Sequence, residues 1–315
     1  MQRLAILKTS LFFTVVVFLS GMMTSCVKDE FDADPDLVDP EVKERKLNTG
    51  FTDDVIDIKA ETWSIPYVKG GITGELLKDS NGEPFKVEGN DSIVLDQGWL
   101  SMMKTADNKL KMTLKENFSD SPRHFIIGII SDNKKDEFAI IQSRGEAYEL
   151  VDKKITEVPD SRKVYKSNEG CTTITFVNDT DKPKQVVTSE VFKNVKYSSE
   201  FKSQDYGAFE WVRGQDSLIF MDELLHEGSI YWTKQVPYVS GTTYENYIKP
   251  DGSKEELTLR PFDTKVVSGE MTYIERTCNY TFTIRNKTSG NRFVVSGTWQ
   301  QKVPIISHTL LNDPK

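Results

Sequence analysis

Short segments in which apolar and polar side chains alternate are the sequence feature that most constrains this fold. Residues 110–114 (LKMTL) and 280–284 (YTFTI) are two clear cases. Such alternation is typical of a β-strand with one buried face. Turn-forming clusters, for example at 69–71 and 288–291, separate segments of this kind, and no long stretch has a helical period. The pattern therefore predicts an all-β protein made of antiparallel, Ig-like β-sandwiches rather than an α/β fold.

The length of the chain, 315 residues, suits about two such domains after an N-terminal segment. We place the first sandwich at 51–150 and the second at 171–315. The stretch 151–170 between them is polar and charged, and it contains Pro159, Ser161 and Ser167. This composition predicts a linker.

The N-terminus has the pattern of a processing segment. Arg3 and Lys8 precede an apolar stretch at 11–19, and small residues then lead to Cys26. The apolar stretch is shorter than the about 20 residues that a membrane-spanning helix needs. The pattern resembles the signal peptide of bacterial lipoproteins, and the alternative is an uncleaved N-terminal helix. The resemblance implies that residues 1–25 are removed and that Cys26 carries the lipid that anchors the protein to a membrane.

Residues 26–50 are crowded with aspartate and glutamate, which predicts an extended acidic tether. The signature Lys28-Asp29-Glu30 resembles the surface-export signal of Bacteroidetes lipoproteins. It implies the outer membrane and the cell surface, with the periplasmic face as the alternative. The net charge of −8 argues against nucleic acid as a partner, because such binding depends on Lys and Arg side chains at phosphates.

Two cysteines remain after Cys26. Cys171 and Cys278 form an even pair in an exported chain, which permits a disulfide. Cys278 shares strand parity with Tyr280 and Phe282 and should therefore point into a core. Two free thiols are the alternative.

The first domain resembles a known family. Trp99 is followed by the alternating strand 110–114, and then by Asn117, Arg123 and Gln142 in that order. This order is similar to that of the BACON domain, the Bacteroidetes-associated carbohydrate-binding domain that is often N-terminal. The resemblance implies an Ig-like sandwich whose members bind carbohydrate or act as spacers. Each motif residue also has a structural explanation, such as core packing for Trp99 and a turn for Asn117.

The second domain is rich in aromatic residues. Twelve lie between Phe192 and Tyr247, about twice the density of the whole chain, in which 10% of residues are aromatic. Sugar C–H faces pack on aromatic rings and sugar hydroxyls need polar neighbours, so exposed rings would suit a glycan. Packing in the core is the alternative. The candidate glycan contacts are Trp211, Tyr231, Trp232, Tyr238, Tyr244 and Tyr247.

Catalytic motifs are missing from the sequence. The three histidines have no metal-ligand spacing, and neither a nucleophile elbow nor a phosphate loop is present. We therefore expect no metal, no cofactor and no enzymatic activity. The leading hypothesis is a lipid-anchored accessory protein of the cell envelope that binds or presents glycans. The alternatives are a structural or assembly subunit that binds envelope proteins and, third, a glycoside hydrolase.

Overall fold

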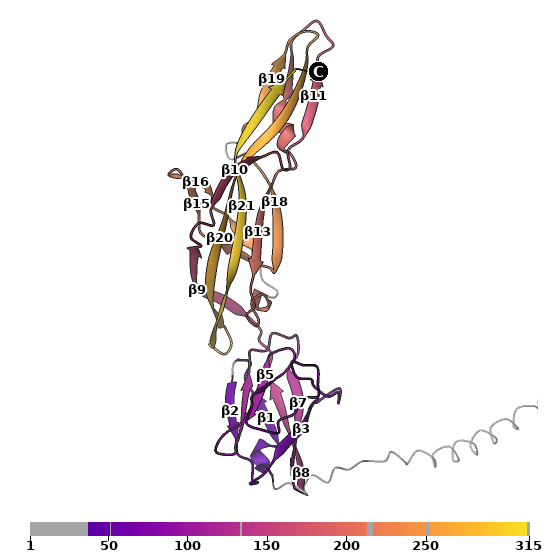
Figure 1. Ribbon diagram of the computed structural model, residues 1–315, viewed down its shortest axis with the longest axis vertical. Helices are drawn as coiled ribbons and strands as arrows, with labels where there is room; N and C mark the ends of the chain where they lie inside the picture. The colour runs from indigo at the N-terminus through magenta and orange to yellow at the C-terminus, as the bar shows by residue number, and fades with distance from the viewer. Residues whose placement is uncertain (1–36, 51, 133, 213–216, 250–251, 314–315) are drawn as a thin grey trace, which may run out of the picture.

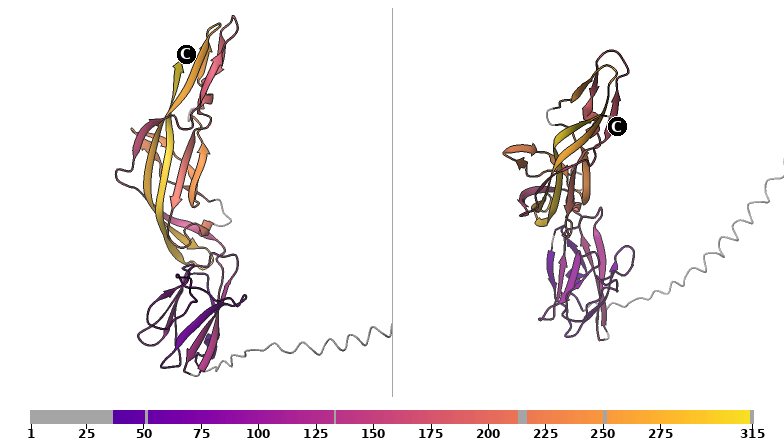
Figure 2. Two further views of the ribbon diagram at one scale, coloured as in Figure 1. Left: turned by 45° about the vertical axis from the view of Figure 1, so that its right-hand side comes forward. Right: turned by 45° about the horizontal axis from the view of Figure 1, so that its top comes forward.

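The computed structural model describes residues 37–50, 52–132, 134–212, 217–249 and 252–313. In these residues the chain forms strands and three short 3-10 helices, and almost all strand pairs are antiparallel. The predicted all-β class is confirmed. Three bodies, each with its own hydrophobic core, lie end to end along the molecule (Figure 1, Figure 2).

The first sandwich comprises residues 37–142. One sheet has the order β1-β8-β7-β3 and the other β2-β6-β5-β4. Alternation fixes which face is buried: Leu110, Met112 and Leu114 of β6 point inward, as their spacing predicts. Trp99 and Phe125 meet edge to face in this core, with ring centroids 5.5 Å apart. The strands are β1 (Glu44–Leu47), β2 (Thr52–Ile56), β3 (Ser64–Gly70), β4 (Ile93–Val94), β5 (Leu100–Lys104), β6 (Leu110–Leu114), β7 (Arg123–Ser131) and β8 (Lys134–Gln142).

The sandwich begins earlier than the predicted boundary at residue 51. Leu37 and Val38 are fully buried in its core, and the 3-10 helix η1 (Pro40–Val42) follows them. β1 then pairs with β8 in parallel, with Glu44 opposite Ala139. Within the predicted tether, residues 37–50 therefore belong to the sandwich, because two apolar side chains and an edge strand outweigh the acidic composition around them.

A long hairpin runs through the other two bodies. Its strands are β20 (Thr264–Asn286) and β21 (Arg292–Asn312). From Ile274 to Asn286 the even-numbered residues of β20 are buried, whereas from Val267 to Tyr273 the odd-numbered ones are. The pairing register with β21 shifts between Thr272 and Tyr273: Thr272 pairs with Ile306, whereas Tyr273 pairs with Pro304. The two cores therefore lie on opposite faces of one hairpin, with a β-bulge where they meet.

The middle body packs on residues 274–286 and 292–303 of this hairpin. Its aromatic core centres on Tyr238, Tyr280, Phe282 and Trp299, all fully buried. A segment that we call the flap, residues 217–240, covers this core with two small antiparallel ladders. The remaining strands are β9 (Tyr148–Glu157), β10 (Lys163–Ser167), β13 (Lys196–Lys202), β14 (Leu218–Phe220), β15 (Leu224–His226), β16 (Ser229–Trp232), β17 (Gln235–Pro237) and β18 (Gly241–Asn246), with the 3-10 helix η3 (Glu210–Val212).

The distal body lies at the end of the molecule opposite the first sandwich (Figure 1). It packs on residues 264–273 and 304–312 of the hairpin around Val191, Val267, Met271 and Tyr273. Its other elements are β11 (Thr173–Val177), β12 (Lys184–Val187), β19 (Glu256–Leu259) and the 3-10 helix η2 (Thr188–Phe192).

The segment 151–170 is not a linker. β9 pairs with β20 from Cys278 to Asn286, and β10 pairs with β20 from Met271 to Glu275. Both strands lie at the edge of the sheet and carry lysines toward solvent, such as Lys154 and Lys163, so their composition is polar although their backbone is fully part of the ladder.

Candidate functional site

Most of the candidate aromatic residues belong to the core of the middle body. Trp211, Trp232 and Tyr238 are buried, and Tyr238 packs against Phe201 with ring centroids 5.0 Å apart. Trp211 and Tyr238 therefore offer no ring face to a ligand at the surface, and core packing accounts for them.

The other candidates are more accessible. Tyr231 and Tyr247 are half-buried, and Tyr244 is 68% exposed. In the adjacent pair Tyr231 and Trp232, Trp232 faces the core and Tyr231 lies beside His226, with ring centroids 6.1 Å apart. Tyr244 lies on β18, at the edge of the large sheet.

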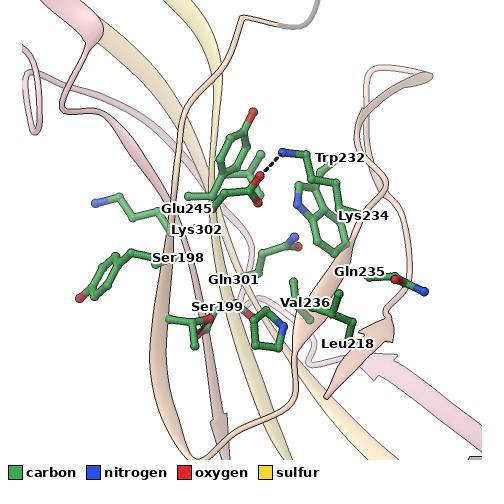
Figure 3. A pocket seen from close by; sticks show the side chains of 15 residues that line it. Ser198, Ser199, Leu218, Trp232, Lys234, Gln235, Val236, Glu245, Gln301 and Lys302 are labelled. Atoms are coloured by element: carbon green, nitrogen blue, oxygen red, sulfur yellow. Dashed lines mark hydrogen bonds and ion pairs between the residues drawn. The ribbon is translucent and has the colours of Figure 1, made fainter. Parts of the chain in front are cut away.

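A groove of about 330 Å³ brings three aromatic residues of this region together. It lies between the flap and the sheet strands β13, β18 and β21 (Figure 3). Trp232, Tyr197 and Tyr244 contribute ring surface, and Val236 and Pro237 of the flap add aliphatic surface. Polar lining comes from Ser198, Ser199, Lys234, Gln235, Thr243, Glu245, Gln301 and Lys302.

Gln301 supplies an unpartnered donor to this groove. Its side chain is almost completely buried, and Oε1 accepts a hydrogen bond of 2.8 Å from Nε of Arg276. An arginine can only donate, so the oxygen must face Arg276 and the amide nitrogen must point elsewhere. In the described part of the chain, Nε2 of Gln301 has no hydrogen-bond partner. Figure 3 shows this amide and the Trp232 indole among the side chains that line the groove.

Arg276 fixes both Gln301 and the flap. Its guanidinium is buried, and desolvation lowers its pKa from the ordinary arginine value. It donates to the carbonyl oxygens of Asp222 (2.7 Å) and Glu223 (3.1 Å) in the flap. Arg162 donates to the carbonyl of Leu225 in the same segment (2.6 Å). Arg276 on β20 and Arg162 between β9 and β10 thus hold the flap, the segment that carries Trp232 and Lys234.

An ion pair spans the groove between the flap and the edge strand. Lys234 Nζ lies 2.9 Å from Oε1 of Glu245, and the same ammonium lies 4.5 Å from the ring centroid of Tyr197 (Figure 3). Glu245 is the one carboxylate among the described residues that line the groove. The site therefore offers hydrogen-bonding groups and ring surface, whereas glycoside hydrolysis ordinarily needs two carboxyl groups.

The motif residues of the first sandwich meet one another. The Arg123 guanidinium lies 4.4 Å from the Trp99 ring centroid and donates to Oε1 of Gln142 at 2.8 Å. Asn117 is fully buried and donates to the carbonyl of Ser121. Arg123 also donates to the hydroxyl of Tyr206 in the middle body. These groups are occupied with each other, so they hold the sandwich and its joint together.

The structure does not pair the two cysteines. Cys278 is buried in the core of the middle body, whereas Cys171 packs against the core of the distal body, and both are free thiols. Burial raises the pKa of the Cys278 thiol to about 11. Cys26 lies outside the described residues. So do the signal segment and residues 28–30.

Gln301, Arg276 and Lys234 were not among the residues predicted from the sequence. A signal for the first two exists, because each shares the inward parity of its strand: Arg276 with Cys278, and Gln301 with Trp299. A polar side chain at an inward position must find partners. Lys234 had no such signal, since it lies in the short connection between β16 and β17.

Comparisons with known proteins give no family. No protein-family model matches the chain, and no curated protein does. Within the part of the chain that is described, no helix is long and apolar enough to cross a membrane, and no group of three or more His, Cys, Asp or Glu side chains could hold a metal ion.

Several solved structures match parts of the chain, each with a low TM-score. A protein of Bacteroides thetaiotaomicron, solved by NMR, matches 33% of this chain over 79% of its own length, with 21% identity and a TM-score of 0.25. A lamprey immune protein matches 84% of this chain and 92% of its own, with 12% identity and a TM-score of 0.31. The complex of Dpr2 Ig1-Ig2 with DIP-Theta Ig1-Ig3 matches 88% of this chain and 96% of its own, with 7% identity and a TM-score of 0.24. These values are low, and no family follows from them.

Proposed function

We propose that this protein is a non-enzymatic lipoprotein of the cell envelope that binds carbohydrate in the groove between the flap and β18. The observation that carries the proposal is the free donor of Gln301 in the groove that Trp232 also lines. A buried donor without a partner costs about 1–3 kcal/mol, and a ligand oxygen would recover this. Rings together with hydroxyl, amide and ionic groups suit a neutral, polyhydroxylated ligand.

The first sandwich fits the role of a spacer in this proposal. We infer that it is a BACON-like module, because the residues that carry the resemblance make internal contacts: Arg123 with Trp99 and Gln142, and Asn117 with Ser121. The lipid on Cys26 would anchor the chain at the outer membrane, on the cell surface or on the periplasmic face. The three bodies in line would then hold the groove away from the membrane.

A glycan array tests the proposal with a matched pair of variants. Gln301→Glu keeps an acceptor for Arg276 and replaces the free N–H group by an oxygen. Gln300→Glu makes the same change at the exposed neighbouring position. We expect the full-length chain in detergent and the Gln300→Glu variant to bind the same glycans. Gln301→Glu should bind about tenfold more weakly or worse, because the ligand oxygen loses its donor and faces a carboxylate oxygen. An array on which the wild-type chain binds no polysaccharide would contradict the proposal.

One observation favours an assembly subunit as a second candidate. β18 pairs with β13 and, within the described residues, with no strand on its other side. Tyr247 donates to the carbonyl of Val195, so ladder alternation turns the backbone groups of Thr242, Tyr244 and Asn246 away from β13. β18 has neither Lys nor Pro, the usual protection of an edge.

A proline on β18, at a residue whose N–H group points away from β13, distinguishes the glycan-binding function from the assembly function. Thr242→Pro removes an N–H group that β13 does not use, so the ladder with β13 stays intact. The measurements are chemical crosslinking to envelope proteins in cells and glycan binding. If the edge accepts a partner strand, Thr242→Pro should lose the crosslink that the wild type forms and keep glycan binding. If the groove alone is functional, Thr242→Pro should match the wild type in both measurements.

A further inference from the structure

A second and larger cavity lies where the first sandwich meets the middle body. Its volume is about 530 Å³. Lys115 and Phe118 line it from the first sandwich, and Tyr206, Arg292 and Phe293 from the middle body. A ligand in this cleft would therefore contact both bodies. The cleft shares no lining residue with the groove.

The floor of the cleft is aromatic and rigid. The Phe118 ring lies 5.5 Å from that of Phe293 and 5.8 Å from that of Tyr206, measured between centroids. Gly207 lies directly against Phe118, since a Cβ atom there would come within 2.0 Å of the ring. Phe118 is buried and supports the half-buried Phe293, whose ring gives an apolar surface on which the C–H face of a sugar can pack.

Two cations, Lys115 and Arg292, border this floor. Lys115 Nζ lies 5.3 Å from the ring centroid of Tyr206, and Arg292 opens β21 at the surface. Among the described residues, neither side chain forms a salt bridge, although the chain as a whole carries a net charge of −8. Unpaired cations from two bodies at one cavity favour an anionic ligand.

The two carboxylates of the cleft are engaged elsewhere. Glu116 accepts hydrogen bonds from the hydroxyl of Tyr148 (2.9 Å) and from Nδ2 of Asn286 (2.7 Å). Asp205 accepts a hydrogen bond of 2.6 Å from the backbone N–H of Ser296. Neither forms an ion pair with Lys115 or Arg292, so these cations are available to a ligand.

We propose that this cleft is a binding site for carboxylated sugars, the uronic acid units of an acidic polysaccharide. The sugar ring would pack on Phe293, and its carboxylate would bind Lys115 and Arg292 through charge-assisted hydrogen bonds. Because the two cations belong to different bodies, the ligand would also stabilise the joint between them. The inference stands apart from the groove and does not depend on it.

Calorimetry with tetragalacturonate tests this site on the full-length chain in detergent. We expect wild-type protein to bind it, with affinity falling as salt is added, and to bind uncharged cellotetraose more weakly in the cleft. The double variant Lys115→Gln, Arg292→Gln should lose about tenfold or more of the affinity for tetragalacturonate, the scale of two charge-assisted hydrogen bonds. Gln301→Glu should leave this affinity unchanged, which separates the cleft from the groove.

The matched control removes the same charge elsewhere. Lys163 and Arg260 are exposed cations far from the cleft in sequence, and neither forms an ion pair with another described residue. The double variant Lys163→Gln, Arg260→Gln should bind tetragalacturonate as the wild type does. Three outcomes would overturn the proposal: no binding by the wild type at millimolar ligand, equal losses in both double variants, or no loss in the cleft variant.

Discussion

A single buried guanidinium organises the candidate groove. Arg276 is 5% exposed and donates to Gln301 and to the flap carbonyls of Asp222 and Glu223. Its position follows from strand parity, because it points inward with Ile274 and Cys278. Burying a charge is costly unless each of its donors finds an acceptor, and here the surrounding backbone and Gln301 provide them.

Removing the Arg276 guanidinium should lower the free energy of unfolding far more than removing an exposed guanidinium. Arg276→Met leaves Gln301 and two flap carbonyls without their donor, so we expect about 3–5 kcal/mol less free energy of unfolding. Arg285→Met is the control, since Arg285 forms an exposed ion pair with Glu149 and should cost about 0–1 kcal/mol. Urea denaturation of both variants measures the difference. Equal losses would mean that the buried network does not hold the flap.

Glu116 makes the stability of the joint between the first sandwich and the middle body depend on pH. Desolvation raises its pKa, against the hydrogen bonds from Asn286 and Tyr148 that lower it. The folded chain therefore keeps a proton on this carboxyl at a higher pH than the unfolded chain. The ionised group costs stability at neutral pH, and this cost is relieved as the pH falls through the raised pKa.

The variant Glu116→Gln isolates this effect. The amide keeps an acceptor oxygen for Tyr148 and Asn286 and does not titrate. We expect the variant to be more stable than the wild type at neutral pH, with a difference that shrinks as the pH falls toward the ordinary range of glutamate. Thermal unfolding of both chains across this pH range gives the answer, and two parallel curves would show that Glu116 is not the titrating group.

At the scale of elements, side-chain alternation predicted where strands form, but it did not predict which strands pair with each other. The alternating residues of β6 and of the segment 280–284 in β20 are buried on one face, as expected. β9 and β10 were missed because edge strands with lysines on the solvent side have the composition of a linker. The aromatic segment was noticed, but whether Tyr238 or Tyr244 is exposed depends on which elements cover the sheet, and composition does not contain that information.

Because two cores lie on opposite faces of the hairpin β20–β21, we expect substitutions of two adjacent residues to affect different bodies. Tyr273 belongs to the distal core and Ile274 to the middle core, although they are adjacent in β20. Tyr273→Ala and Ile274→Ala should each cost about 2–5 kcal/mol by leaving a cavity. Hydrogen exchange should rise in β11 and β19 for the first variant and in β13 and β17 for the second. Increased exchange in the same body for both would contradict the assignment of opposite faces.

At the scale of the whole molecule, the proposed spacer role depends on a stiff joint between the first sandwich and the middle body. Phe118 comes from the first sandwich, yet it packs in the middle core against Tyr148 and Phe293. The Arg123 guanidinium donates across the same joint to the Tyr206 hydroxyl. An apolar side chain locked between two bodies and a hydrogen bond beside it restrict rotation in different directions, so together they keep the bodies in line (Figure 2).

Phe118→Ala should therefore loosen the joint while each body stays folded. The substitution removes the ring that fills the space beside Gly207, so the two bodies lose their main apolar contact. We expect small-angle X-ray scattering to show a broader range of shapes than in the wild type, and proteolysis to become faster between β8 and β9. Phe262→Ala is the control, because Phe262 is an exposed phenylalanine in the distal body. Scattering from Phe118→Ala that matches the wild type would show that the joint is held by Arg123 and Tyr206 instead.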